Sequence, residues 1–215
     1  MNALGILGGT FDPPHLGHLA LAEAALAHLP IEQVLWLPSG NPGHRAQPVA
    51  SGRDRLAMLK LAIAGEPRYR VDAAELAHGE QTYTVHSLTR LRAQLGDTRP
   101  LVLLLGSDSF LTLPTWLRWR ELFELAHIAV ASRPGDGASE PSAELAAEIA
   151  RRLTLPHELR ASAAGRIAYF AMPPTDISAS AVRAALAAGQ DPEHLLPAAV
   201  LAYIRSHRLY SKEKP

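Results

Sequence analysis

Short apolar runs alternate with helical patterns along most of the chain, and this alternation limits the fold more than any other feature. The runs that predict strands are Leu4–Leu7, Gln33–Leu37, Tyr69–Asp72, Leu101–Leu105, Ile128–Ala131 and Ile167–Phe170. The segments that predict helices are Leu16–Leu29, Arg53–Ala64, Thr84–Leu95, Trp116–Leu125, Ala143–Leu153, Ala179–Ala188 and Ala198–His207. Strands separated by helices predict an α/β fold with a doubly wound parallel sheet. The last two helical patterns predict a helical C-terminal part.

The run "LVLLL", Leu101–Leu105, is apolar at every position. This is typical of a central strand that helices cover on both sides. Gly106 follows this strand, and Gly8 ends the first predicted strand. Ligands of such sheets bind at the carboxyl ends of the strands, near the point where the strand order reverses. We therefore expect both strand exits to face one cleft.

Charge and composition exclude several classes of function. The 215 residues contain 21 Lys and Arg against 21 Asp and Glu, so the formal net charge is zero. Broad binding to nucleic acid or to an anionic membrane needs a basic surface, so neither partner is expected. The chain contains no cysteine, which excludes disulfides, thiolate nucleophiles and cysteine metal sites. The sequence begins without a secretory signal and has no long apolar run, so we expect a soluble, cytoplasmic protein.

Two long connections rich in proline, glycine or serine interrupt the pattern, at residues 38–51 and 132–142. Loops of this length are usually functional or disordered. The alternation of strands and helices resumes after the second connection, which we interpret as a mobile surface loop and not as a domain boundary. Residues 1–215 are therefore predicted to form one domain. Ser51 is placed to cap the helix that follows it, and Gly189 to end the penultimate helix.

The stretch "GILGGTFDPPHLGH" combines a strand, a glycine turn and two histidines at a helix start. Gly8 and Gly9 have no side chain, so phosphates of a ligand could approach the backbone closely. The predicted helix begins near Leu16, where free N–H groups and the helix dipole favour an anion. His15 and His18 lie about one turn apart at this end. Their rings suit the charge that develops on phosphorus during substitution.

Two other interpretations of the histidine pair are open. Both rings could bind a metal from one helix face, although neither an HExxH motif nor a cysteine partner is present. Alternatively, His18 could be a purely structural residue, capped and buried at the helix start.

Two motifs carry a resemblance to a known family. "GGTFDPPHLGH" resembles the first signature of the HxGH nucleotidyltransferase superfamily, and "DISASAVR", residues 176–183, resembles its second, phosphate-binding signature. "LPSGNPGHR", "GEQTYTVHSLTRLR", "LLGSDSFLTLPTWLRWREL" and "YIRSHRLY" resemble the bacterial nicotinate-nucleotide adenylyltransferases within that superfamily. The sequence departs from the family at Gly43, where a second proline is usual, and at Ala179, where serine is frequent. The first change could loosen the loop that carries His44, whereas the second leaves the phosphate-binding residues intact.

The resemblance implies a Rossmann-like nucleotidyltransferase fold and a transfer reaction of NAD biosynthesis. The family uses Mg²⁺ and transfers the adenylyl group of ATP to nicotinate mononucleotide, which releases pyrophosphate. The mononucleotide phosphate attacks the α-phosphorus directly, so the protein must position groups and stabilise charge more than abstract a proton. The resemblance implies no dedicated metal ligands, since the ATP phosphates would hold most of the Mg²⁺.

The resemblance assigns catalytic roles to His18, His15 and Arg183. His18 would contact the α-phosphate, His15 would assist on the ATP phosphates, and Arg183 would bind the departing pyrophosphate. Asp108 would accept hydrogen bonds from ribose hydroxyls, although "GSDSF" fits a helix cap at this residue nearly as well. The whole ATP-binding set would be Gly8, Gly9, Thr10, Phe11, His15, His18, Gly106, Asp108, Ile177, Ser178, Ser180 and Arg183.

The residues that the resemblance assigns to the mononucleotide are His44, Arg45, Tyr83, Thr84, Trp116 and Arg133. The first two and Arg133 would hold its phosphate, although each alone could be a solvated surface charge. Trp116 would stack on the pyridine ring, but an isolated tryptophan is more often a core residue, as is expected of Trp119. Backbone N–H groups at Tyr83 and Thr84 would bind the ring carboxylate.

Three rival functions fit part of this pattern. The nearest is an adenylyl- or cytidylyltransferase of the same superfamily that acts on another phosphorylated acceptor. A non-catalytic nucleotide-binding sensor would bind ATP without releasing pyrophosphate. A histidine-metal phosphohydrolase would hydrolyse ATP without any acceptor.

Overall fold

The main sheet is parallel, so the carboxyl ends of all its strands lie on the same side of the molecule. The computed structural model describes residues 3–42, 47–77, 81–132 and 140–211. Its main sheet contains β1 (Ala3–Gly9), β2 (Ile31–Pro38), β4 (Tyr69–Val71), β6 (Leu101–Gly106), β7 (His127–Ser132) and β8 (Ile167–Ala171). The strand order is β4-β2-β1-β6-β7-β8, and all neighbours pair in parallel. The predicted strands and the doubly wound fold are confirmed.

The strand order reverses between β1 and β6. The chain starts in the middle of the sheet, builds outward to β2 and β4, and then returns to β6 on the other side of β1. The two central strands pair from Leu4 opposite Leu101 to Ile6 opposite Leu103. This is the switch point at which a doubly wound sheet binds its ligand.

Six of the predicted helices are confirmed to within two residues. They are α1 (Leu16–His28), α2 (Gly52–Ala62), α4 (Thr84–Leu95), α7 (Ala143–Arg152), α8 (Ala179–Ala187) and α9 (Ala198–Ser206). The Ser51 hydroxyl accepts a hydrogen bond from the Asp54 N–H at 3.1 Å, which confirms the predicted cap of α2. Gly189 has a φ of +72° and ends α8 in the left-handed conformation that glycine adopts easily.

The predicted helix at Trp116–Leu125 is wrong. The structure has two 3-10 turns, η1 (Leu113–Thr115) and η2 (Trp119–Glu121), followed by the short helix α6 (Leu122–Leu125). Trp116 is extended, with a ψ of 146°, and Arg118 is left-handed, with a φ of 53°. These two conformations break the helical repeat, so that Trp119 is buried in an apolar cluster whereas Trp116 only packs against that cluster and stays partly exposed.

Several short elements gave no periodic pattern in the sequence. They are α3 (Ala74–Ala77), α5 (Ser107–Leu111), the 3-10 turn η3 (Pro156–Arg160), and the two-stranded sheet of β3 (Asn41–Pro42) and β5 (Gln81–Thr82). Elements of two to five residues are shorter than the windows in which a period can be counted.

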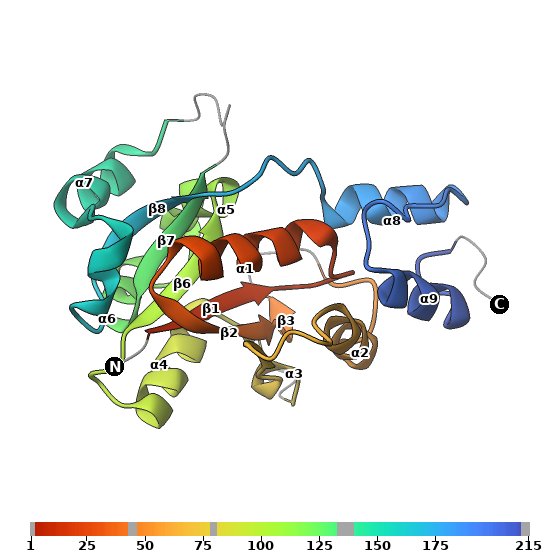
Figure 1. Cartoon of the computed structure of the whole chain (residues 1–215), viewed down its shortest axis with the longest axis horizontal. Coiled ribbons are helices and arrows are strands. Elements are labelled where there is room, and N and C mark those ends of the chain that lie inside the picture. The colour runs from red at the N-terminus through yellow and green to blue at the C-terminus, as the bar shows by residue number, and fades with distance from the viewer. Residues whose placement is uncertain (1–2, 43–46, 78–80, 133–139, 212–215) are drawn as a thin grey trace.

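Helices cover both faces of the sheet, as the fully apolar strand β6 predicts. Val102 and Leu104 of β6 belong to the apolar cluster that includes α1, which lies across the sheet in Figure 1. Leu103 and Leu105 point to the opposite face and pack in a second cluster with α4, α5 and α6. The side chains of this strand therefore alternate between two apolar clusters, and all of them are buried from water.

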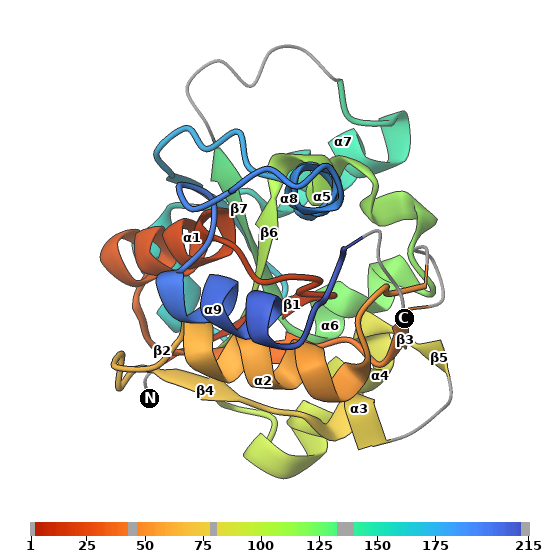
Figure 2. The ribbon, with the colours of Figure 1, turned by 90° about the vertical axis from the view of Figure 1, so that its right-hand side faces the viewer.

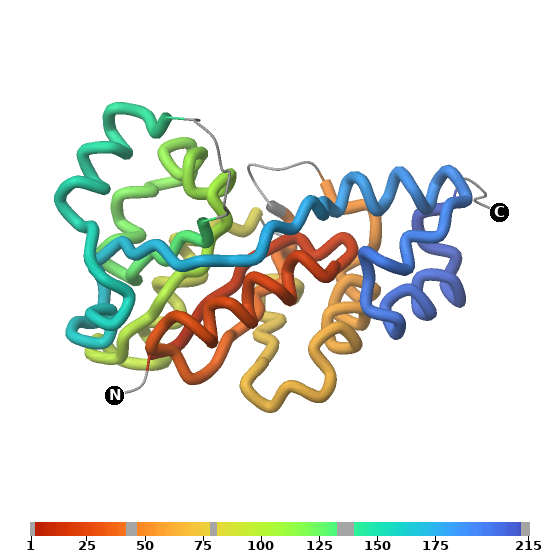
Figure 3. Tube along the Cα trace, turned by 45° about the horizontal axis from the view of Figure 1, so that its top comes forward, coloured from red at the N-terminus to blue at the C-terminus, as the bar shows by residue number. Residues whose placement is uncertain are grey.

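The C-terminal part packs beside the sheet and not on it. After β8, residues 172–178 cross the molecule in an extended path to α8, as the tube in Figure 3 shows. A third apolar cluster joins α2, α8 and α9 through Met58, Val182, Val200, Leu201 and Ile204. Figure 2 shows α9 lying against α2. Within the described ranges, no helix has the length and apolar character needed to cross a membrane.

Candidate functional site

A cavity of about 410 Å³ lies at the switch point, at the carboxyl ends of β1 and β6. This volume is within the range of about 300–1,000 Å³ that is usual for small-molecule sites. The cavity brings together residues of both predicted signatures, together with Gly106 and Asp108. Its lining includes Gly8, Gly9, Thr10, Phe11, Asp12, His15, Gly17, His18, Gly106, Asp108, Trp116, Thr175, Ile177, Ala179, Ser180 and Arg183.

The glycines of the first signature make room in different ways. A Cβ at Gly8 would meet no atom within 4 Å, so this position is open to a ligand as predicted. A Cβ at Gly9 would lie 3.0 Å from the Phe11 ring, and one at Gly17 would lie 3.1 Å from the His15 ring. Gly9 and Gly17 therefore allow close packing within the loop itself.

His15 and His18 form a stacked pair at the start of α1. Their ring centroids are 3.7 Å apart and their planes are inclined by 29°. The backbone N–H of His15 donates to Nδ1 of His18 at 3.2 Å. Because Nδ1 accepts this bond, a neutral His18 carries its proton on Nε2. His18 thus caps the helix, as the structural interpretation predicts, but it is half-buried and not fully buried, and it lines the cavity.

His15 is the more buried member of the pair, with 7 % of its surface exposed. Burial lowers the pKa of His15 to about 4, so its imidazole is neutral at pH 7. Its Nδ1 atom is buried and has no hydrogen-bond partner among the described residues. Among the residues that the structure describes, no group of three or more histidine, aspartate or glutamate side chains could hold a metal ion.

The second signature lies opposite the first, at the start of α8. Ser180 and Arg183 line the cavity together with Ile177. The Arg183 guanidinium donates to the Asp12 carbonyl at 2.8 Å and to the Ser180 hydroxyl at 3.2 Å. Ser178, unlike Ile177, Ser180 and Arg183, does not line the cavity. Its hydroxyl instead caps α8 by accepting from the Ala181 N–H at 3.1 Å.

Gly106 and Asp108 lie where β6 passes into α5. Gly106 occupies the N-cap position, and Asp108 follows in the first turn. Asp108 is therefore not the helix cap, and its side chain belongs to the cavity wall.

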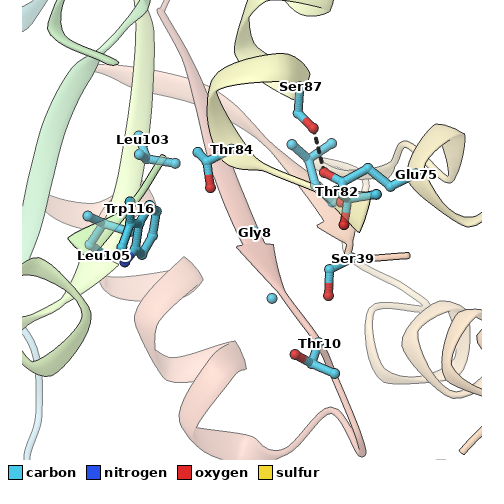
Figure 4. A pocket seen from close by; sticks show the side chains of 12 residues that line it. Gly8, Thr10, Ser39, Glu75, Thr82, Thr84, Ser87, Leu103, Leu105 and Trp116 are labelled. Atoms are coloured by element: carbon cyan, nitrogen blue, oxygen red, sulfur yellow. Dashed lines mark hydrogen bonds between the residues drawn. The ribbon is translucent and has the colours of Figure 1, made fainter. Parts of the chain in front are cut away.

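A second, narrower pocket of about 60 Å³ adjoins the first and shares Gly8, Gly9, Thr10, Leu105 and Trp116 with it. Figure 4 shows Leu103, Leu105 and Trp116 on one side and Ser39, Glu75 and Thr82 on the other. Thr84 and Ser87 of α4 complete the wall. The Ser87 hydroxyl donates to Glu75 Oε1 at 2.6 Å.

The two tryptophans of "LPTWLRWREL" both contact the second apolar cluster but differ in burial. Trp116 is half-buried and lines both pockets. Trp119 is 6 % exposed and packs in the second apolar cluster, as its core interpretation predicts.

The predicted carboxylate-binding segment lies at the start of α4. Tyr83 is the N-cap residue and Thr84 is the first helical residue of α4, and the Tyr83 carbonyl accepts the first helical hydrogen bond, from the His86 N–H at 3.0 Å. Thr84 lines the narrow pocket, whereas the Tyr83 hydroxyl donates to Gln81 Oε1 at 2.8 Å and Tyr83 is not among the lining residues. The predicted phosphate-binding residues His44, Arg45 and Arg133 lie outside the described residues.

Comparison with known proteins now identifies the family. The profile of the cytidylyltransferase-like family matches residues 6–185. A probable nicotinate-nucleotide adenylyltransferase from Dechloromonas aromatica is 47 % identical over 211 residues, which cover 96 % of this chain and 97 % of the relative. The corresponding protein of Laribacter hongkongensis is 48 % identical, with 99 % and 96 % covered. The chain belongs to the nicotinate-nucleotide adenylyltransferase family.

Solved structures of this family have the same fold. A nicotinic acid mononucleotide adenylyltransferase of Plasmodium falciparum, complexed with NaAD, matches with a TM-score of 0.71 over 98 % of both chains at 16 % identity. A putative nicotinate-nucleotide adenylyltransferase of Vibrio parahaemolyticus matches with a TM-score of 0.66, over 99 % of this chain and 98 % of that one. At 16–17 % identity, these matches establish the Rossmann-like architecture alone.

Unpartnered polar atoms gather at the two pockets of this adenylyltransferase. In the described part of the chain, six buried side-chain polar atoms have no hydrogen-bond partner. Four of them belong to pocket residues: His15 and Thr175 at the larger cavity, and Ser39 and Thr82 at the narrower one. Buried polar groups are otherwise nearly always paired, so these atoms indicate sites that a ligand or ordered water completes.

Sequence reasoning missed Arg55, which hydrogen-bonds to the backbone of residues that line the pockets. This side chain is 2 % exposed, and its guanidinium donates to the carbonyls of Thr10 at 2.8 Å, Ser39 at 2.7 Å and Gly40 at 3.2 Å. Burial lowers the pKa of Arg55, partly offset by the charge of Asp12. The one signal in the sequence is an arginine on the same helical face as Met58 and Leu59, both of which are buried.

Asp12 and Tyr210 were also missed as individual residues. Asp12 lies inside the first signature and Tyr210 inside "YIRSHRLY", but nothing in the sequence joins them. In the structure the Tyr210 hydroxyl donates to Asp12 Oδ1 at 2.6 Å.

Proposed function

We propose that this protein transfers the adenylyl group of ATP to nicotinate mononucleotide, forming nicotinate adenine dinucleotide and pyrophosphate in NAD biosynthesis. The observation that carries the proposal is the meeting of His18, Arg183 and the open backbone at Gly8 around one cavity. An adjoining pocket lined by Trp116 and Thr84 offers a place for the acceptor. Both features belong to a chain whose relatives carry the name of this enzyme.

The proposed reaction is one in-line displacement. An oxygen of the acceptor phosphate forms a bond to the α-phosphorus of ATP, and the bond from that phosphorus to the bridging oxygen breaks. The electron pair of the broken bond leaves with pyrophosphate. The acceptor phosphate is already largely ionised near neutral pH, so no side chain has to remove a proton. The protein therefore contributes positioning and charge stabilisation.

The histidine pair and Arg183 act on the phosphate charge. The Nε2–H of His18 donates to an oxygen of the α-phosphate as charge develops there. Neutral His15 stacks against the His18 ring. Its Nδ1 atom, which has no partner among the described residues, is proposed to interact with the ATP phosphates. Arg183, which is always charged and can bind two oxygens at once, stabilises the departing pyrophosphate. Ser180 and the backbone N–H groups at the start of α8 complete this end.

Mg²⁺ fits this site as a companion of ATP. Two carboxylates line the larger cavity, those of Asp12 and Asp108. The Asp12 oxygens already accept hydrogen bonds from Val49, Ala50 and Tyr210, which leaves Asp108 as the available acid. Mg²⁺ keeps several waters and is usually bound by one or two carboxylates plus substrate phosphates. The ion neutralises charge on the phosphates when it is bound.

The narrow pocket is proposed to hold the pyridine ring. Trp116 stacks on the ring, and the N–H groups at Tyr83 and Thr84, at the start of α4, bind its carboxylate. The hydroxyls of Ser39 and Thr82 lie in the same pocket without a partner and can bind the ligand or its waters. At about 60 Å³ the pocket must widen as the ring enters. His44, Arg45 and Arg133 are proposed to hold the acceptor phosphate.

We also propose that residues 1–215 act as one domain in the cytoplasm. The third apolar cluster joins the C-terminal helices to α2, which supports a single unit.

The test is pyrophosphate release from ATP and Mg²⁺ with nicotinate mononucleotide and nicotinamide mononucleotide in parallel. Donors at the start of α4 pair with both oxygens of a carboxylate, whereas an amide turns an NH₂ group toward a donor. A site built in this way can reject the mismatched analogue by up to about 10⁴-fold. We expect kcat/KM to favour nicotinate mononucleotide by at least about 100-fold.

Each other outcome points to a rival. Equal efficiencies or a preference for the amide would overturn the carboxylate site but leave adenylyl transfer standing. Release only with a different phosphorylated acceptor would identify another transferase of the superfamily. ATP binding without release would indicate a sensor, and phosphate release without an acceptor would indicate a hydrolase.

A further inference from the structure

Asp12 is a buried residue of the loop that connects β1 to α1, and it connects three segments of the chain through hydrogen bonds. Its side chain is 3 % exposed, and its carboxylate accepts three hydrogen bonds from two distant segments. The Val49 N–H donates to Oδ2 at 2.7 Å, and the Ala50 N–H donates to Oδ1 at 3.1 Å. The third donor is the Tyr210 hydroxyl, at 2.6 Å from Oδ1. A carboxylate so fully engaged has a positioning role and is not free to act as a base.

Tyr210 reaches Asp12 from the far end of the chain. Helix α9 ends at Ser206, and the following turn brings the chain back toward the end of β1, as Figure 2 shows. Arg208 and Tyr210 both adopt positive φ angles, of 50° and 63°. Such angles are unfavourable for side chains of this size, so tertiary contacts must hold the turn. Burial and the contact with Asp12 raise the pKa of Tyr210, so its hydroxyl remains a donor.

Asp12 also holds Arg183. The backbone carbonyl of Asp12 accepts a hydrogen bond from Arg183 Nη1 at 2.8 Å. Asp12 itself lines the larger cavity, as do Phe11, His15 and His18. Any shift of Asp12 therefore moves an anchor of the guanidinium as well as the loop that carries the histidines.

We propose that Tyr210 is a positioning residue for the ATP phosphates: its hydroxyl fixes Asp12, and through the Asp12 carbonyl it fixes Arg183. The C-terminal turn is then part of the active-site construction, although Tyr210 does not touch the substrate. This inference rests on the proposed function only in naming ATP as the ligand.

The test removes the hydroxyl alone, with Tyr210→Phe. Tyr203→Phe is the matched control, because Tyr203 lies on the same terminal segment and its hydroxyl donates to Asp54 at 3.0 Å, away from both pockets. The primary measurement is equilibrium binding of a non-hydrolysable ATP analogue with Mg²⁺ and without acceptor. Steady-state kinetics with both substrates and the melting temperature accompany it.

We expect Tyr210→Phe to weaken analogue binding about ten-fold, because Arg183 is then no longer held in place before the phosphates bind and must be ordered on binding. The acceptor KM should change less than three-fold, and Tyr203→Phe should change neither quantity more than two-fold. In an Arg183→Lys background, Tyr210→Phe should weaken analogue binding less than two-fold further, because the anchor it serves is already lost.

Analogue binding within two-fold of wild type would overturn the proposal, as would full additivity with Arg183→Lys. Equal losses in both substrates that follow the fall in melting temperature would also overturn it, since they indicate general destabilisation. Because the binding measurement needs no turnover, an absence of pyrophosphate release in the wild type would count against the proposed function and not against this inference.

Discussion

The imidazole rings of His15 and His18 stack with their centroids 3.7 Å apart. Two rings at this distance cannot easily carry a positive charge at the same time, because like charges in contact disfavour each other. Burial keeps His15 neutral. The half-buried His18, with its proton on Nε2, is therefore the member of the pair suited to meet developing charge on a phosphate.

Removal of the His18 ring should lower turnover without unfolding the protein. His18→Ala should reduce kcat by about 10²–10³-fold, as loss of one transition-state donor does elsewhere. His18→Asn is the matched variant, since its side-chain oxygen can still accept from the His15 N–H while the Nε2 donor is gone. Steady-state kinetics on both variants would give similar losses, and near-normal turnover in either would remove His18 from the mechanism.

The buried His15 should make stability depend on pH. Its folded pKa of about 4 lies below the ordinary value of 6.5, so the unfolded chain binds the proton more tightly. The contribution is complete above pH 6.5 and declines as the pH falls toward 4, by about 2 kcal/mol at pH 5. Urea unfolding at pH 7.5 and pH 5 measures it.

His15→Asn should reduce this pH dependence, and His28→Asn, at the exposed far end of α1, should leave it unchanged. His127 adds a term of the same sign, because burial also lowers its pKa. An equal pH dependence in wild type and His15→Asn would contradict the assignment.

Arg55 should be important for the stability of the loops around both pockets. Arg55→Met would leave three carbonyls without their donor and should lower the free energy of unfolding by about 2–4 kcal/mol. Arg53→Met on the exposed face of the same helix should change it by less than about 0.5 kcal/mol. Chemical unfolding compares the two, and equal effects would show that the guanidinium does not hold these loops.

The two neighbouring tryptophans should separate binding from stability. Trp116→Ala should raise the KM for the mononucleotide much more than the KM for ATP, with little change in melting temperature. Trp119→Ala should lower the free energy of unfolding by about 3–5 kcal/mol, as is usual for a buried aromatic residue. Kinetics and thermal unfolding on both variants provide the test. Loss of stability without a KM change in Trp116→Ala would show that this residue serves the core and not the mononucleotide site.

The sequence was a good guide wherever the structure repeats a local pattern. The strand of Leu101–Leu105 is apolar at each position because helices cover it on both sides, and α4 begins and ends at the predicted residues. The pairing of His15 with His18 was also readable, since residues three apart on a helix share a face. Segments without a period were not readable, and the predicted helix at Trp116 was wrong because left-handed Arg118 interrupts it.

The sequence by itself determined the order of strands and helices and the two signatures that meet at the switch point. Only the tertiary structure decided what holds those signatures in place. Asp12 and Tyr210 are separated by 198 positions, and the Arg55 guanidinium joins carbonyls from the ends of two strands. Such contacts leave no periodic trace, because hydrogen bonds between distant segments depend on where the whole chain packs and not on the spacing of neighbouring residues.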